Sequence, residues 1–168
     1  VYPLPVAGAS TSLAVCSTDA AQSLFTLLGP SAQAGGAWSG PSTVNSGSYD
    51  PATMNPGLYT YTVSGTSPCP NATATVDVTE STPPVAGTDN SIPLCSTGSR
   101  VVMVTQLGGS PAGNGSWTGP DGTAVSGGLN PAIDPQGIYV YTVSGISPCP
   151  NAMAELTVVI NTPPDPGT

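Results

Sequence analysis

Apolar and polar residues alternate along most of the chain in short runs bounded by glycine, proline, asparagine or serine. In residues 59–63, Tyr59, Tyr61 and Val63 share one face of a strand, and the two threonines between them share the other. The alternation continues in residues 73–78, and both segments recur at 139–143 and 153–158. Because successive side chains of a strand point to opposite faces, this period of two predicts two β-hairpins.

Strands are also predicted at residues 13–15 and 92–94. Pro93 cannot donate to a ladder of hydrogen bonds, so this strand is expected at a sheet edge, or broken there. Segments 24–28 and 103–107 leave two interpretations open. One is a strand with alternate residues facing inward, and the other is a single helical turn.

The chain aligns with itself. Cys16 and Cys95 are 79 positions apart, whereas Cys69 and Cys149 are 80 positions apart. The extra residue falls in a turn rich in glycine, serine and asparagine, so the two halves are expected to differ mainly around residues 42–46 and 121–126. The sequence therefore predicts an all-β chain of two tandem immunoglobulin-like β-sandwich repeats of about 80 residues each.

The expected boundaries place repeat 1 at residues 1–82 and repeat 2 at residues 83–162. Residues 163–168 resemble the opening of repeat 2 and are interpreted as the start of a further repeat or as a linker. On this interpretation the chain is a segment of a longer array. The repeated Thr-Pro-Pro junctions at 82–84 and 162–164 favour a semi-rigid spacing between modules.

Large aromatic residues at equivalent positions of the repeats are the expected core anchors, because they bury the most apolar area. They are Trp38, Tyr59 and Tyr61 in repeat 1, and Trp117, Tyr139 and Tyr141 in repeat 2.

Charge excludes several classes of function. Arg100 is the only basic residue, histidine is absent, and nine carboxylates give a net charge of -8. Nucleic acid is not an expected partner, because phosphate binding needs clustered lysine and arginine. Without histidine or lysine the usual general bases are missing, so an enzyme is not expected. No apolar run approaches the roughly 20 residues of a membrane span.

Each repeat carries two cysteines at matching places, which predicts one disulfide inside each repeat. The expected pairs are Cys16 with Cys69 and Cys95 with Cys149. Disulfides indicate an oxidising compartment, so the chain is expected outside the cell or at its surface. Zinc binding is disfavoured, because no histidine and no Cys-x-x-Cys pair is present.

No cofactor is required by the sequence, but calcium needs only oxygen ligands. The candidate ligands are Asp50 with Asn55, Asn130 with Asp134, and the linker residues Asp89 and Asp165. The competing interpretation, which we favour, is that Asp-Pro and Asn-Pro begin turns in which the side chain bonds the nearby backbone.

The run Asp50-Pro51-Ala52-Thr53-Met54-Asn55-Pro56-Gly57-Leu58-Tyr59-Thr60-Tyr61-Thr62-Val63, followed by Cys69-Pro70-Asn71, resembles the immunoglobulin-like and PKD-like repeats of large Bacteroidota cell-surface proteins, including gliding-motility-type adhesins. The resemblance covers both repeats and implies stacked modules at the cell surface. Gly57-x-Tyr59-x-Tyr61 is similar to the tyrosine corner of immunoglobulin domains. Tyr61 stands where an antibody-type domain has its second core cysteine, so ligand-binding rules of antibodies do not transfer.

Together these features predict a structural repeat segment of an extracellular filament, stalk or surface adhesin. Its expected partners are neighbouring repeats or identical subunits, arranged head to tail. The alternative is an adhesive module that itself binds a glycan or a protein ligand.

Overall fold

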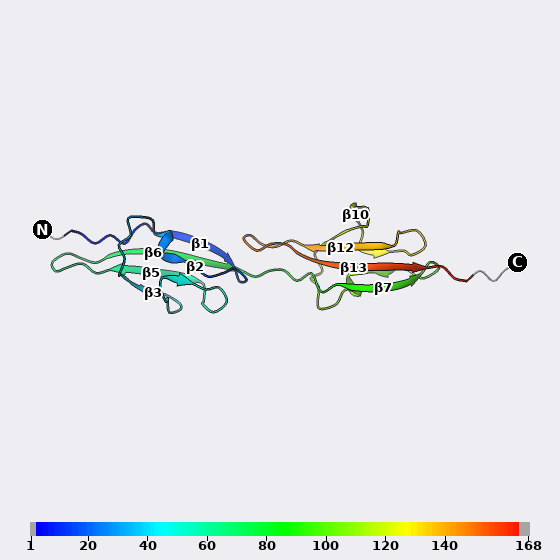
Figure 1. Cartoon of the computed structure of the whole chain (residues 1–168), viewed down its shortest axis with the longest axis horizontal. Coiled ribbons are helices and arrows are strands. Elements are labelled where there is room, and N and C mark those ends of the chain that lie inside the picture. Colours follow the sequence, from blue (N-terminus) through cyan, green and yellow to red (C-terminus); the bar gives the residue numbers. More distant parts are fainter. Residues whose placement is uncertain (1–2, 165–168) are drawn as a thin grey trace. The chain divides into compact units, whose positions relative to one another are not determined.

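The computed structural model describes residues 3–164. These residues form strands joined by turns, with only two short helical segments, so the all-β prediction is confirmed (Figure 1). The chain divides into two compact units, with the boundary between Thr82 and Pro83. A short segment, Ser147–Cys149, groups with the first unit. Part of the segment interpreted as a further repeat, residues 165–168, lies outside the described residues.

The first unit contains a four-stranded sheet in the order β1-β6-β5-β3. Its strands are β1 (Thr11–Cys16), β3 (Ala37–Ser39), β5 (Gly57–Val63) and β6 (Ala72–Ser81). A second, smaller sheet pairs β2 (Gln22–Ser23) with β4 (Ser48–Tyr49).

The second unit repeats this order with one strand added, β10-β9-β12-β13-β7. Its strands are β7 (Asn90–Cys95), β9 (Ser116–Thr118), β10 (Ala124–Val125), β12 (Gly137–Val143) and β13 (Ala152–Asn161). The small sheet pairs β8 (Val101–Val102) with β11 (Gly128–Leu129). The added strand, β10, lies within residues 121–126, where the change of sequence offset predicted a difference.

Both predicted hairpins are present. β5 and β6 are antiparallel, with Tyr59 opposite Val76, and β12 and β13 are antiparallel, with Tyr139 opposite Leu156. These four side chains are buried, and the neighbouring residues on either side of each one along its strand are more exposed. The period-two pattern therefore identified the inward face correctly.

The first strand of each unit lies at a sheet edge, as Pro93 predicted for β7. Both edge strands run parallel to their partners: β1 to β6, and β7 to β13. In this register Cys16 stands opposite Ser81, and Cys95 stands opposite Asn161. Each cysteine is thus placed at the far end of a long strand, which the sequence pattern did not reveal.

Segments 24–28 and 103–107 contain helical turns, so the strand interpretation of them is wrong. They form α1 (Leu24–Leu27) and the 3-10 helix η1 (Met103–Gln106). The Ser23 hydroxyl accepts a hydrogen bond from the backbone N–H of Thr26 at 3.3 Å, which caps α1. Leu24 and Leu28 are buried while Thr26 is exposed, because residues four apart share a helix face.

Each unit has its own apolar core between its two sheets. Five of the six predicted anchors are buried: Tyr59, Tyr61, Trp117, Tyr139 and Tyr141. Trp38 is only partly buried and packs against the edge of its core. Strand β10 explains the difference, because Val125 pairs with Trp117 while residues 42–46 form no equivalent strand beside Trp38. Among residues 3–164, no helix is long and apolar enough to span a membrane.

Candidate functional site

The cysteines are positioned by the sheet register. Cys16 lies level with Ser81, the last residue of β6, whereas Cys69 lies in the turn before the first residue of β6. A strand rises about 3.3 Å per residue, so the 10 residues of β6 hold these cysteines about 30 Å apart. Disulfide-bonded Cα atoms lie less than about 7 Å apart. The fold therefore rules out a bond between Cys16 and Cys69.

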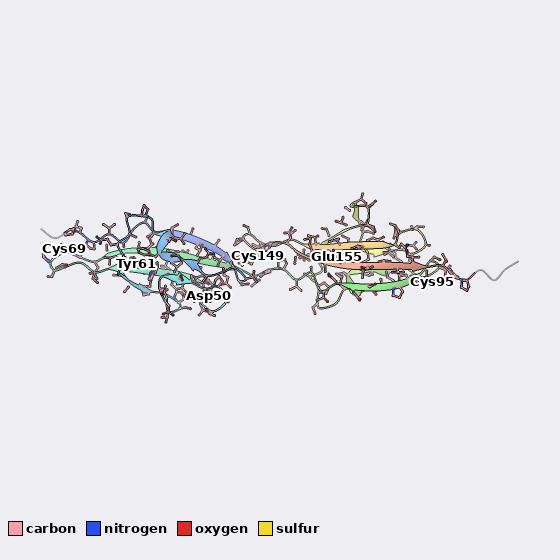
Figure 2. The ribbon with its side chains drawn as sticks, viewed as in Figure 1. Asp50, Tyr61, Cys69, Cys95, Cys149 and Glu155 are labelled. Atoms are coloured by element: carbon pink, nitrogen blue, oxygen red, sulfur yellow. A yellow bond between two sulfur atoms is a disulfide. The ribbon has the colours of Figure 1, made fainter. Side chains whose placement is uncertain are left out.

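The second unit has the same arrangement. Cys149 lies in the turn between β12 and β13, and Cys95 lies level with Asn161 at the other end of β13. Figure 2 shows these two cysteines at opposite ends of the strands. The predicted bond between Cys95 and Cys149 is excluded for the same reason.

The structure instead bonds Cys16 to Cys149, with Cα atoms 4.9 Å apart and a sequence separation of 133. The predicted pairing within each repeat is therefore wrong. Both bonded cysteines are buried, with exposed fractions of 0% and 5%. Cys69 and Cys95 are unpaired; the first is half-buried and the second is exposed.

A threonine lies beside the sulfur of each first-strand cysteine. The Thr18 hydroxyl donates to the Cys16 sulfur at 3.4 Å, and the Thr97 hydroxyl lies 3.2 Å from the Cys95 sulfur. Hydrogen bonds from the Thr97 side chain and backbone lower the pKa of the exposed Cys95 thiol. A lower pKa increases the thiolate fraction, which is the reactive form of cysteine.

A groove lies beside the tryptophan of each unit. In the first unit it has a volume of about 470 Å³ and is lined by Trp38, Tyr61 and Phe25, among others. The Tyr61 hydroxyl donates to the Gln33 carbonyl at 2.7 Å and accepts from the Gly36 N–H at 2.8 Å. These bonds fix the loop that forms one wall, and the partly buried indole of Trp38 lies 5.0 Å from the Tyr61 ring.

The second groove, of about 590 Å³, is built in the same way. The Tyr141 hydroxyl donates to the Ala112 carbonyl at 2.5 Å and accepts from the Gly115 N–H at 2.8 Å. Trp117 lies 4.9 Å from the Tyr141 ring. Arg100 adds a positive charge to this wall only, and its Nη2 donates to the Ser126 hydroxyl at 3.2 Å.

Asp165 lies outside the described residues, and the Asp89 carboxylate accepts a hydrogen bond from the Glu155 N–H at 2.8 Å. The other four calcium candidates lie in two equivalent turns. Asp50 accepts hydrogen bonds on both carboxylate oxygens, from the Ala52 N–H and the Thr53 hydroxyl, each at 3.0 Å. The Asn55 N–H donates to Ser42 at 2.8 Å.

In the second turn, the Asn130 side chain accepts from the Ala132 N–H at 3.1 Å. The Asp134 carboxylate accepts from the Asn130 N–H at 2.6 Å. These bonds are the turn contacts that the competing interpretation expects. No group of three or more cysteine, aspartate or glutamate side chains within residues 3–164 is arranged to hold a metal ion.

Sequence reasoning missed one polar contact at the edge of a core, between a buried tyrosine and a half-buried glutamate. Tyr49 is fully buried in the first core, and its hydroxyl donates to the Glu80 carboxylate at 2.8 Å and to the Met54 carbonyl at 3.3 Å. Burial, and then the neighbouring Glu80, raise the pKa of the Tyr49 phenol well above its usual range. The equivalent positions in the second unit hold Leu129 and Ile160, so the internal repeat gave no indication of this pair.

Comparison with solved structures identifies the fold class. Immunoglobulin domains 1–4 of Sidekick-1 match 93% of this chain with a TM-score of 0.50 and 13% sequence identity. The match covers 48% of that structure, so the chain spans about half its length. A structure of Sidekick-1 immunoglobulin domains 1–5 matches 91% of this chain and 38% of its own, with 13% identity and a TM-score of 0.46. No protein-family model and no curated protein matches the chain.

The chain is therefore a tandem of immunoglobulin-like β-sandwich repeats. At 13% identity this likeness describes the fold and not the function.

Proposed function

We propose that this chain is a structural repeat segment of an extracellular filament, stalk or surface adhesin. The observation that carries the proposal is the disulfide between Cys16, in repeat 1, and Cys149, in repeat 2. A bond between successive repeats provides a second covalent route along the chain. A role in carrying tension favours such a route, whereas a soluble ligand-binding module has no need of it.

Other features support the same role. The chain has no histidine and no lysine, so it lacks the usual catalytic bases. The disulfide favours an oxidising compartment, which supports a location outside the cell. The resemblance of residues 50–63 and 69–71 to repeats of large Bacteroidota surface proteins supports a place in such a protein.

Pulling on the two ends of single molecules tests this role. Force applied at the termini passes through the Cys16–Cys149 bond and bypasses the residues between them. An unfolded chain extends by about 3.4 Å per residue, so the sequence separation of 133 between the two cysteines accounts for about 450 Å of extension. The oxidised chain should therefore extend about 450 Å less than the reduced chain before it becomes taut.

A Cys16→Ser variant is the matched control, because it should extend fully with and without reductant. Equal extension of the oxidised and the reduced wild-type chain would contradict a role of this bond in carrying tension. Electron microscopy of native material provides the second test: filaments or stalks are expected, and compact globular particles would count against the proposal.

A second function is favoured by the two grooves. Because Trp38 is partly buried and lies beside the ring of Tyr61, its indole offers a stacking surface for a sugar or an apolar side chain. The recurrence of the groove in both units supports a glycan- or protein-binding adhesive module. Exposed Ala34 lines the first groove, and exposed Gly113 lines the second.

Groove-blocking variants distinguish this second function from the first. Ala34→Phe and Gly113→Phe add bulk at exposed wall positions and leave the cores untouched. Saturable binding of the wild-type chain to a panel of polysaccharides, abolished in the double variant, would support an adhesive role. Absence of saturable binding, or binding that survives the double variant, would contradict it.

A further inference from the structure

Cys69 and Cys95 are unpaired, yet each is equivalent to one member of the bonded pair. The first-strand cysteines are Cys16 and Cys95, and the hairpin cysteines are Cys69 and Cys149. The bond in this structure joins one cysteine of each kind, a first-strand cysteine of repeat 1 and a hairpin cysteine of repeat 2. The unpaired cysteines are therefore Cys69, the hairpin cysteine of repeat 1, and Cys95, the first-strand cysteine of repeat 2.

The backbone around the two first-strand cysteines is the same. The Ser17 N–H donates to the Ser81 carbonyl and the Ser96 N–H donates to the Asn161 carbonyl, both at 2.9 Å. Each cysteine also has a threonine hydroxyl against its sulfur. The end of β7 is thus built like the end of β1, where the disulfide forms.

The hairpin turns are also alike. The Asn71 side chain accepts from the Gly65 N–H at 3.0 Å, and the Asn151 side chain accepts from the Gly145 N–H at 3.0 Å. These bonds close the loop that carries the cysteine in each repeat. The turn around Cys69 therefore presents its thiol on a loop fixed in the same way as the loop of Cys149.

Exposure separates the bonded from the unpaired cysteines. Cys16 and Cys149 are buried together, whereas Cys95 is exposed and Cys69 is half-buried. Cysteine is among the most buried residue types, so an exposed thiol at a position that is buried in the other repeat indicates an absent partner.

We propose that Cys95 bonds the hairpin cysteine of a following copy of this module, and that Cys69 bonds the first-strand cysteine of a preceding copy. The partner at each end is thus a second copy of the same module, arranged head to tail. This inference rests on the proposed structural function and identifies the residues that would join its units.

The bond forms by two thiol–disulfide exchanges with a small-molecule disulfide such as oxidised glutathione. The Cys95 thiolate attacks that disulfide, and one glutathione thiolate leaves. The Cys69 thiolate of the second copy then attacks the Cys95 sulfur, and the second glutathione thiolate leaves. Two cysteine thiols are oxidised, the small disulfide is reduced to two thiols, and these take up the two protons.

Two single variants test whether the pairing is specific. Cys69→Ser leaves only the Cys95 thiol, and Cys95→Ser leaves only the Cys69 thiol. Each is incubated with oxidised glutathione alone and in an equal mixture, and products are analysed by non-reducing electrophoresis and peptide mass mapping. The mixture should yield dimer several-fold faster than either variant alone, with Cys69 linked to Cys95. The wild-type chain should form a ladder that collapses on reduction.

The Cys69→Ser/Cys95→Ser double variant is the control. It retains the Cys16–Cys149 bond, should stay monomeric, and should melt with the wild-type profile. Equal dimer yields in all three incubations would mean random collision and would overturn the proposal. Thiols that stay free, or a bond between Cys69 and Cys95 of one chain, would also overturn it.

A polypeptide carrying the chain twice in tandem distinguishes the two sources of a second copy. A bond between its first Cys95 and its second Cys69 identifies a neighbour in the same polypeptide, and a ladder without that internal bond identifies separate chains. Formation of neither overturns the proposal. The pulling experiment depends only on the Cys16–Cys149 bond, so failure of the ladder leaves the test of the structural function independent.

Discussion

Replacing Tyr49 by phenylalanine should destabilise the first unit while leaving its packing intact. The ring of Tyr49 packs edge-on against Tyr59, with centroids 5.7 Å apart, and phenylalanine preserves this contact. The lost hydroxyl donates to the Glu80 carboxylate at 2.8 Å. Hydrogen bonds to charged groups contribute about 1.5–3 kcal/mol. Glu80 is half-buried and can regain water, so we expect a loss of about 1–2 kcal/mol.

Each unit contains one tryptophan, so urea unfolding followed by fluorescence can assign this loss to one unit. Measurements are made in a Trp117→Phe background, in which Trp38 reports on the first unit alone. Glu80→Gln is the matched control, because glutamine keeps a hydrogen-bond acceptor and removes only the charge. It should cost less than about 1 kcal/mol. An unchanged free energy of unfolding in Tyr49→Phe would refute a stabilising role for the pair.

The raised pKa of Tyr49 adds a dependence on pH. Above the ordinary tyrosine pKa of 10.0 the unfolded chain loses the phenolic proton, while the folded unit retains it. Stability therefore falls as pH rises through this range, by up to about 1.4 kcal/mol per pH unit. Tyr49→Phe removes this contribution, so the stability gap between wild type and variant should narrow from about pH 8 to about pH 11. A gap that is constant or widens over this range would contradict the reasoning.

Three further predictions concern the grooves and the free thiols. A Cβ at Gly115 would lie 2.5 Å from the Tyr141 ring, so Gly115→Ala should lower the free energy of unfolding by about 1–3 kcal/mol in urea titrations. Gly113→Ala, with no atom within 4 Å of the added Cβ, should be neutral or slightly stabilising, and equal losses in the two variants would contradict the crowding argument. Acrylamide should quench Trp38 more than Trp117, measured in single-tryptophan variants; equal quenching would contradict the open first groove. Iodoacetamide should alkylate the exposed Cys95 before the half-buried Cys69, as measured by mass mapping at early time points. Alkylation of Cys69 first would contradict this prediction.

The strands and most of the core could be predicted from the sequence, because their evidence is local. Alternation in residues 59–63 and 139–143 directly reports which face is buried. The helical turn at Leu24 was harder to assign, since a four-residue segment gives no periodicity that separates strand from helix. Trp38 and Trp117 occupy matching positions, but the burial of Trp117 depends on β10, which exists in one repeat only.

The disulfide could not be predicted, for a reason of topology. The internal repeat shows that Cys16 is equivalent to Cys95 and that Cys69 is equivalent to Cys149. It does not show whether a first-strand cysteine bonds the hairpin cysteine of its own repeat or that of the other repeat. The answer depends on the parallel register of β1 with β6, a contact between strands distant in sequence. Tyr49 was missed because it has no aromatic counterpart in repeat 2.

The Tyr49–Glu80 pair is present in repeat 1 only, whereas the cysteines are present in both repeats. The physical constraints on the two regions explain this difference. A carboxylate at position 160 would lie against the second core, where Leu129 replaces the tyrosine that donates to Glu80 in repeat 1. An isoleucine at position 80 would leave the Tyr49 hydroxyl with only the longer bond to the Met54 carbonyl. Tyr49 and Glu80 lie within one repeat, so both residues can be substituted together without affecting another module. A disulfide between repeats has its two partners in different modules. For every junction of an array to be bonded, each repeat must carry both cysteines, one at each end of its long strand. The occurrence of both kinds in both repeats, with one of each unpaired in this chain, is therefore the arrangement that an array bonded at successive junctions requires.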